Sequence, residues 1–332
     1  TPIDQITADK PLFNYLIKSK EEWGGAGGYL TEPLRVKNDG NGQDYFGADQ
    51  VNFNARDPIK RTRWPYYGYH QGYGFDEDTL QSAGIQISDD SQTVVATADE
   101  KYRLGNLYKE VIESMRLSTQ VDLDERFHLN GAQSAKAAPG LDSLISLTPT
   151  VGTVGGLDAA QFDFWRNNTR LGIVTAPIAD GPINAALKAM WRASMLYGGV
   201  TPDGIFCGLA FLEALEAENR VIQRIEVMSN GRQGTDLDGA IRNTTFNGVP
   251  VMWDPTHERL DAQYGPFSTP WTNRCYMHNS KTGMRLRPIK GAWMQHRKPK
   301  RMHDRYVHFC AMTSKYGMTI GQRNATAVLS IT

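Results

Sequence analysis

The 332-residue chain is long enough for two domains, or for one domain with long excursions. Its 36 basic and 36 acidic side chains give a formal net charge of zero, which argues against a globally cationic nucleic-acid-binding protein and opposes self-association only weakly. No run approaches the ~20 apolar residues that a membrane-spanning helix needs. The widely spaced Cys207, Cys275 and Cys310 show neither a disulfide framework nor zinc spacing, so we expect reduced, buried thiols.

Residues 20–79 are poor in aliphatic side chains and rich in aromatic ones. Five positions are Leu, Ile or Val, against eleven aromatic residues and ten glycines. Such a stretch contributes little to a core of its own, whereas Tyr and Trp are enriched where one protein meets another. We therefore predict an arm or long loop that neighbouring subunits complete; the alternative is a flexible surface insertion.

An amphipathic patch at residues 12–17 predicts a short helix or an extended anchor. The glycines at 24–28 break the chain and are not a phosphate loop, because no apolar strand precedes them and no Lys-Ser/Thr follows. Strand-like alternation at 51–53 and 85–87 brackets residues 57–78, for which we predict a long hairpin. Its rings and acids are candidate intersubunit contacts: Trp64, Tyr66, Tyr67, Tyr69, Tyr73, Phe75, Asp76, Glu77 and Asp78.

The clearest predicted element is a long helix over residues 97–130. Thr97 and Glu100 form a capping box, apolar residues follow at the spacing of one helical face, and Asn130-Gly131 ends the run. At 1.5 Å per residue the helix is roughly 45 Å long. We interpret it as a structural beam, since it carries no titratable cluster typical of a catalytic bundle.

After residue 140 the pattern is that of a mixed α/β unit. We predict helices from Pro182 and over 209–219, and a loop over 228–243. Asn247-Gly248 is a strong hairpin signal. Further strands are predicted at 204–207, 275–278, 284–286 and 306–312, followed by a closing hairpin of 316–320 with 325–331.

A basic stretch lies between residues 284 and 305, with eight Lys or Arg side chains and one acid. Three interpretations stay open: an intersubunit partner for acids at 76–78 or 89–90, a solvated face, or nonspecific binding of DNA phosphates. The candidate residues are Arg297, Lys298, Lys300, Arg301 and Arg305.

Enzyme signatures are absent from the sequence. The seven histidines are scattered, and neither His-Glu-x-x-His nor Gly-x-Ser-x-Gly occurs. We therefore expect no enzyme, no catalytic residue, no cofactor and no metal site.

Six short motifs follow the predicted arm, hairpin and beam helix in a set order. The motifs are Gly140-Leu141-Asp142-Ser143-Leu144-Ile145, Gly155-Gly156-Leu157-Asp158, Phe164-Trp165-Arg166-Asn167, Pro202-Asp203-Gly204-Ile205, Phe246-Asn247-Gly248-Val249-Pro250-Val251 and Met284-Arg285-Leu286-Arg287-Pro288. In that order and spacing, over residues ~45 to 332, they resemble the major capsid proteins of tailed bacteriophages, which have the HK97-type fold.

The resemblance implies an α+β, HK97-like capsid fold in five parts. These are an N-terminal arm (1–49), an extended E-loop hairpin (50–96), a peripheral domain with the spine helix (97–164), an axial domain (165–284) and a return to the peripheral domain (285–332).

The implied function is that of a coat protein. It would self-assemble into pentamers and hexamers of an icosahedral shell around double-stranded phage DNA, in a virion assembled in the host bacterial cytoplasm. The implied partners are further copies of the chain, scaffolding, portal and cement proteins and nonspecifically held DNA, with no membrane. A nanocompartment shell of the encapsulin type is the alternative, and a soluble α/β hydrolase a distant one.

Overall fold

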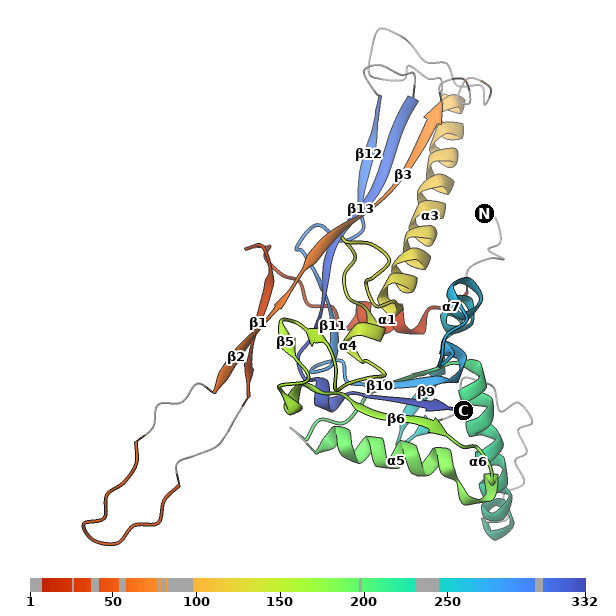
Figure 1. Ribbon diagram of the computed structural model, residues 1–332. Coiled ribbons are helices and arrows are strands. Elements are labelled where there is room, and N and C mark those ends of the chain that lie inside the picture. Colours follow the sequence, from red (N-terminus) through yellow and green to blue (C-terminus); the bar gives the residue numbers. More distant parts are fainter. Residues whose placement is uncertain are drawn as a thin grey trace.

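The structure is a computed structural model that describes residues 8–25, 27–36, 42–53, 58–76, 78, 82, 98–196, 199–230, 245–301 and 307–332. A long helix stands beside three long strands, above a six-stranded sheet with two helices beneath it (Figure 1). A hairpin projects sideways, well clear of the rest of the chain. Among the described helices, none is both long enough and apolar enough to cross a membrane.

The six-stranded sheet has the order β6-β14-β10-β7-β9-β8. β14 pairs in parallel with β6, and β7 in parallel with β9, while the other neighbours are antiparallel. Its strands are β6 (Asn168–Ile173), β7 (Gly204–Cys207), β8 (Thr245–Phe246), β9 (Val249–Trp253), β10 (Arg274–His278) and β14 (Ala327–Ile331).

This sheet separates two hydrophobic clusters, because successive side chains of a strand point to opposite faces. Phe206, Tyr276 and Val328 belong to one cluster, whereas their chain neighbours Cys207 and Cys275 belong to the other. Every residue of β7, β10 and β14 is buried. Strands of this kind need cover on both faces.

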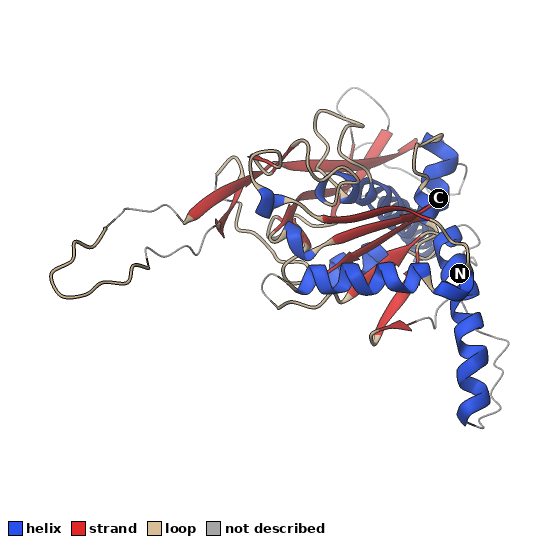
Figure 2. Ribbon diagram, turned by 60° about the horizontal axis from the view of Figure 1, so that its bottom comes forward, coloured by secondary structure: helices blue, strands red, loops and turns tan. Residues whose placement is uncertain are grey.

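The second cluster is covered by α5 (Pro182–Met195) and α6 (Leu209–Asn230), and helices lie along one face of the strands in Figure 2. α5 starts with a proline at its first position, where no backbone N–H is missed. The buried carboxylate of Glu218, from α6, accepts hydrogen bonds from the amides of Ile183 (2.9 Å) and Asn184 (2.8 Å). One helix thereby satisfies the exposed amides at the start of the other.

The second sheet is built around β13 (Val307–Ile320). One edge of β13 pairs with β3 (Tyr66–Asp76); the other pairs with β12 (Gln295–Arg301) and then with β11 (Met284–Pro288). The spine helix α3 (Ala98–His128) runs beside β3 (Figure 1). Tyr69 and Gln71 of β3 hydrogen-bond to Asp122 (2.6 Å) and Ser118 (2.6 Å) of this helix.

Short elements close the first cluster between the two sheets. In α1 (Pro11–Lys18) the apolar face is buried, and Phe13 stacks on Phe127 of α3. Buried Arg323 donates to the carbonyls of Leu144 (2.9 Å) and Trp165 (2.9 Å). The other short elements are α4 (Leu141–Leu144), β4 (Thr153–Val154), β5 (Leu157–Asp158), η1 (Asp163–Trp165), η2 (Ile178–Asp180), α7 (Thr256–Tyr264), η3 (Trp271–Asn273) and η4 (Arg323–Ala325).

The hairpin predicted over residues 57–78 is wrong. β2 (Ile59–Trp64) pairs with β1 (Leu30–Arg35), earlier in the chain, and β3 pairs along its whole length with β13. Only Pro65 separates β2 from β3. The two strands therefore run on in succession and cannot fold back on each other. The alternation at 85–87 lies outside the described residues.

The closing hairpin predicted for 316–320 with 325–331 is also wrong. The first strand belongs to β13 in one sheet, whereas β14 crosses into the six-stranded sheet between β6 and β10. The second predicted helix is longer than expected, because α6 runs to Asn230. Three other predictions are confirmed: the spine helix, the turn at Asn247-Gly248 and the free, buried state of all three cysteines.

Candidate assembly surface

The projecting hairpin is formed by β1, β2 and the long loop between them. The register runs from Leu30 opposite Trp64 to Arg35 opposite Ile59. Residues 42–53 form the far end of the loop (Figure 1). Three hydrogen bonds within this end organise it: Phe46 N to Asp49 Oδ2 (3.0 Å), Gln43 Nε2 to Gln50 O (3.2 Å) and Asn52 N to Gln43 Oε1 (3.2 Å).

The base of the hairpin is anchored in the core. Trp64 is 1% exposed, and its indole N–H donates to Thr62 Oγ1 at 3.0 Å. The amide of Arg63 donates to the carbonyl of Gly155 at 2.9 Å. Leu30, on the opposite strand, joins the same hydrophobic cluster. Both strands are thus held where they leave the core.

An ionic clamp adds to this anchor. The carboxylate of Glu32, on β1, accepts hydrogen bonds from Arg285 (2.7 Å) and Arg287 (3.0 Å) of β11, and from Thr319 Oγ1 of β13 (3.2 Å). Glu21 forms ion pairs with the same two arginines. Charge-assisted bonds to a carboxylate are stronger than neutral ones, so the clamp stiffens the base of the hairpin.

The tip of the hairpin carries large apolar side chains in solvent. Phe46 is 90% exposed and Phe53 is 92% exposed, with Tyr45 beside them at 68%. Single exposed apolar residues are ordinary, but a group of rings on one projecting loop indicates an interaction site. The tip is therefore the part of the described chain best suited to contact another molecule.

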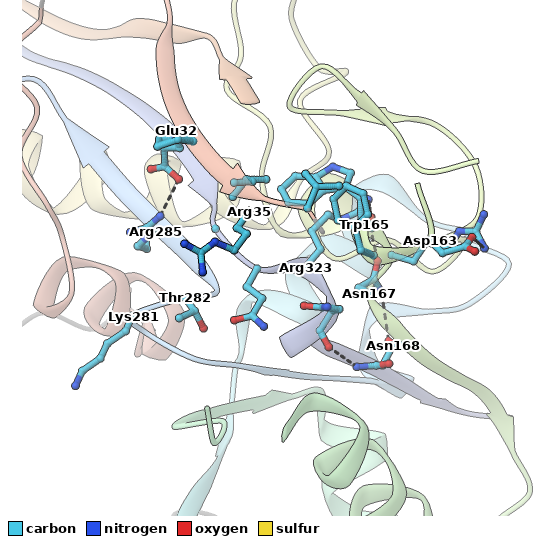
Figure 3. A pocket seen from close by; sticks show the side chains of 18 of the residues that line it. Glu32, Arg35, Asp163, Trp165, Asn167, Asn168, Lys281, Thr282, Arg285 and Arg323 are labelled. Atoms are coloured by element: carbon cyan, nitrogen blue, oxygen red, sulfur yellow. Dashed lines mark hydrogen bonds and ion pairs between the residues drawn. The ribbon is translucent and has the colours of Figure 1, made fainter. Parts of the chain in front are cut away.

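A cavity of about 1010 Å³ opens at the base of the hairpin. Its walls come from β1, η1, η4 and the turn before β11. Glu32 and Arg285 lie at one end of the cavity, and Asn167 and Asn168 lie at the other (Figure 3). Arg35 also lines the cavity. Its wall thus combines cations with amide groups, which is suited to a polar or acidic chain segment.

The aromatic candidates do not gather on one exposed surface. Trp64 lies in the core, so its expected intersubunit role is wrong. Tyr66, Tyr67 and Tyr69 pack against the first cluster of their own chain, and burial together with Asp122 raises the pKa of Tyr69. Part of the stretch 20–79 therefore contributes to the core of its own chain, contrary to the expectation that neighbouring subunits complete this stretch.

The remaining hairpin candidates lie toward the far end of β3. Tyr73 is about half exposed, and Phe75 and Asp76 stand opposite His308 and Val307 of β13. Asp78 is exposed, and Glu77 lies outside the described residues.

The basic candidates lie on β12, on the other side of β13. Arg297 is exposed and donates to Thr313 Oγ1 at 3.2 Å, while Lys300 and Arg301 pair in register with Phe309 and His308. Lys298 lies on the same strand, and Arg305 lies outside the described residues. The acidic and basic candidates thus flank β13 near the same end of one sheet.

Sequence reasoning missed a buried polar cluster at the lower end of the spine helix. It joins Asp124 and His128 of α3 to Asp254, Thr256 and His257, and all five side chains are buried. His128 Nε2 lies 3.1 Å from Asp254 Oδ2, and Thr256 Oγ1 lies 2.5 Å from Asp124 Oδ2. The four-residue spacing of Asp124 and His128 was the available signal, because it places both on one helical face.

The ionisable groups of this cluster are strongly perturbed. Burial opposes charging of His128, but Asp254 and Asp124 outweigh it and raise the pKa to about 9. Burial raises the pKa of Asp124 to about 6. Burial lowers the pKa of His257 to about 3, so this imidazole is neutral.

Comparison with known proteins places the fold. No family model and no curated protein matches the chain. Solved structures do: the capsid of Myoviridae Phage XM1 (TM-score 0.61, 11% identity, 100% of this chain and 95% of that one) and the cyanophage A-1(L) capsid (TM-score 0.59, 14% identity, 99% and 94%). The capsid of a native GTA particle is also similar (TM-score 0.52, 12% identity, 100% and 95%).

The chain therefore has the HK97-like, α+β fold of phage capsid proteins. The resemblance inferred from the short motifs is confirmed at the level of the fold. The similarity spans almost the full length of both partners in each comparison.

Proposed function

We propose that this chain is a major capsid protein, the repeated subunit of a closed shell. The observation that carries the proposal is the fold, matched over nearly the whole chain to capsid subunits. The projecting hairpin supports it, because exposed rings at the end of a rigidly based extension are suited to contact a neighbouring copy. Shell formation by this chain needs no catalytic group.

The mechanism is the addition of many modest contacts. Phe46 and Phe53 leave the water when a neighbouring copy covers the tip, and burying a large apolar side chain contributes about 1.5–3 kcal/mol. The anchored base keeps β1 and β2 in place before contact, which lowers the entropy lost on association. Because each copy both gives and receives such contacts, the stability of the shell grows with closure.

The two sheets support a division of the chain into two domains. We assign α3, β3 and β11–β13 to the peripheral domain, and the six-stranded sheet with α5 and α6 to the axial domain. The hairpin Leu30–Trp64 takes the role expected of the E-loop at residues 50–96. β14, expected in the peripheral return, belongs by its pairing to the axial sheet.

The shell proposed here is built from pentamers and hexamers and assembles in a bacterial cytoplasm. Its other partners are scaffolding, portal and cement proteins and double-stranded DNA, which is packaged nonspecifically. The basic strand β12 is the candidate surface for an intersubunit contact or for DNA phosphates, and a solvated face is the third interpretation.

Electron microscopy of the purified full-length chain tests the proposal. We expect closed, regular shells or their pentameric and hexameric precursors. A monodisperse single copy at high concentration would contradict it and would favour a soluble α/β protein. Shells isolated from the native source should contain double-stranded DNA; an enclosed protein cargo without DNA would identify a nanocompartment instead.

A further inference from the structure

The buried cluster at the lower end of α3 contains two imidazoles and a carboxylate within reach of one ion. One ligand atom from each of His128, Asp254 and His257 lies within 4.8 Å of the other two. All three side chains have no exposed surface. His128 is the last residue of α3, whereas Asp254 lies between β9 and α7 and His257 lies in the first turn of α7. His128 and Asp254 are 126 residues apart along the chain.

The hydrogen bonds of His128 determine which way it faces. Its Nδ1 lies 2.8 Å from the carbonyl oxygen of Asp124. A carbonyl can only accept, so Nδ1 carries the proton and donates it. The lone pair of a neutral Nε2 then points at Asp254 Oδ2, 3.1 Å away. Two lone pairs at this distance repel each other unless a cation, either a proton or a metal ion, lies between them.

A proton on His128 would settle that contact but would leave His257 unexplained. Among the described residues, neither ring nitrogen of His257 has a hydrogen-bond partner, although the side chain is fully buried. A buried polar group without a partner costs about 1–3 kcal/mol. The ring of His257 lies edge-on to that of His128, with 5.2 Å between centroids. A metal ion shared by the three side chains gives His257 the partner that a proton on His128 does not.

The surrounding bonds match those of metal ligands. Metal-binding histidines generally donate their second N–H to a carbonyl or carboxylate, as His128 Nδ1 does to Asp124 O. The other oxygen of Asp254 accepts from the amide of Thr256 at 3.0 Å, which orients the carboxylate. Two buried carboxylates, those of Asp124 and Asp254, also supply the negative charge that a dication needs.

From this geometry we infer that His128, Asp254 and His257 form a binding site for a transition-metal dication of the Zn²⁺ class. Two imidazole nitrogens with one carboxylate oxygen are a known set of protein ligands for Zn²⁺, with a water in the fourth position. The ion would tie the end of the spine helix to the segment between β9 and α7. The site replaces the expectation of no metal and holds whether or not the chain forms shells.

Metal analysis of the full-length chain is the first test. The chain is produced in zinc-supplemented medium, dialysed against metal-free buffer and analysed by elemental mass spectrometry. Any shells that have formed are not disassembled beforehand. We expect about one zinc ion per chain. Replacement by Co²⁺ should produce the intense visible absorption of a low-coordinate nitrogen and oxygen site. Background metal in both measurements would overturn the inference, and would leave the proposed capsid function intact.

The substitution His257→Phe is the second test, because it keeps the ring and removes both nitrogens. If the site binds no metal, the substitution removes two buried nitrogens that lack hydrogen-bond partners, so the thermal unfolding midpoint should stay unchanged or rise. If the inference is right, the variant loses the zinc and its midpoint falls below that of the zinc-loaded chain. His278→Phe is the matched control: His278 is equally buried with an unpartnered Nε2 but lies outside the cluster, so this variant should retain the metal.

Discussion

The indole ring of Trp64 lies directly against the backbone of Gly155. A Cβ added to Gly155 would approach the indole to 2.7 Å, and the glycine has a φ of +61°. The amide of Arg63 also donates to the carbonyl of Gly155. This contact joins the last residue of the projecting hairpin to the turn between β4 and β5, so it locks the hairpin onto the core.

We expect Gly155→Ala to lower the free energy of unfolding by about 2–4 kcal/mol, because it adds both a clash and a disfavoured backbone conformation. Gly156→Ala is the matched control. Its φ is +81°, but nothing lies within 4 Å of the added Cβ, so only the backbone cost of about 1 kcal/mol remains. Denaturant unfolding of both variants checks this. Equal losses would contradict the proposed contact.

The ionic clamp should be sensitive to loss of charge at Glu32. We expect Glu32→Gln to destabilise the chain by about 1–3 kcal/mol, since two largely buried arginines lose a shared carboxylate. Glu113→Gln removes an exposed pair with Arg116 on α3, where we expect about 0.5 kcal/mol or less. Chemical denaturation measures both. A similar, small effect at the two sites would show that the clamp contributes little.

The exposed rings of the hairpin tip should matter for assembly and not for folding. We expect the double variant Phe46→Ser and Phe53→Ser to keep the circular dichroism spectrum and thermal midpoint of the unassembled chain, while closed particles become rare in electron micrographs. Val151→Ser, an exposed apolar residue away from the tip, is the control and should assemble normally. Normal shells from the double variant would refute the role given to the tip.

His278 should make the fold sensitive to acid. It is fully buried, and burial lowers its pKa to about 4, whereas in the unfolded chain a histidine titrates near 6.5. The unfolded state therefore takes up a proton first as the pH falls. Keeping His278 neutral therefore adds to the free energy of unfolding above about pH 6.5. This contribution, about 3 kcal/mol in all, is lost as the pH falls from about 6.5 to about 4.

The substitution His278→Phe tests this pH dependence, because it preserves the ring that packs against Phe206 and Tyr15. We expect the acid-unfolding midpoint of the variant to move to lower pH, with little change at pH 8. Circular dichroism across a pH series measures it. Superimposable acid transitions for the variant and the unsubstituted chain would show that His278 is not the responsible group.

Local sequence patterns were reliable where one element supplies its own signal. The spine helix carries its apolar spacing within one continuous segment, whereas its predicted cap at Thr97 lies outside the described residues. Asn247-Gly248 specifies a tight turn by itself, with both residues at positive φ. The pattern of short motifs likewise led to the capsid fold, because their order reflects the order of the elements along the chain.

Strand pairing was where the same reasoning failed. β2 and β3 follow each other with only Pro65 between them, yet they pair with β1 and β13 in different sheets. The sequence pattern predicts that the aromatic run from Trp64 to Tyr69 is an exposed patch. In the folded chain these rings pack into or against the core. An aromatic side chain is equally suited to a core and to an interface, so composition alone does not distinguish them.

The amino-acid sequence was sufficient to identify a beam helix, a mixed α/β unit and a capsid-like order of motifs in a chain of zero net charge. Which segments meet became visible only in the folded chain. The anchoring of Trp64 on Gly155, the clamp at Glu32 and the His128–Asp254–His257 cluster each join residues far apart along the chain. Such contacts depend on long-range packing, on which local propensity carries no information.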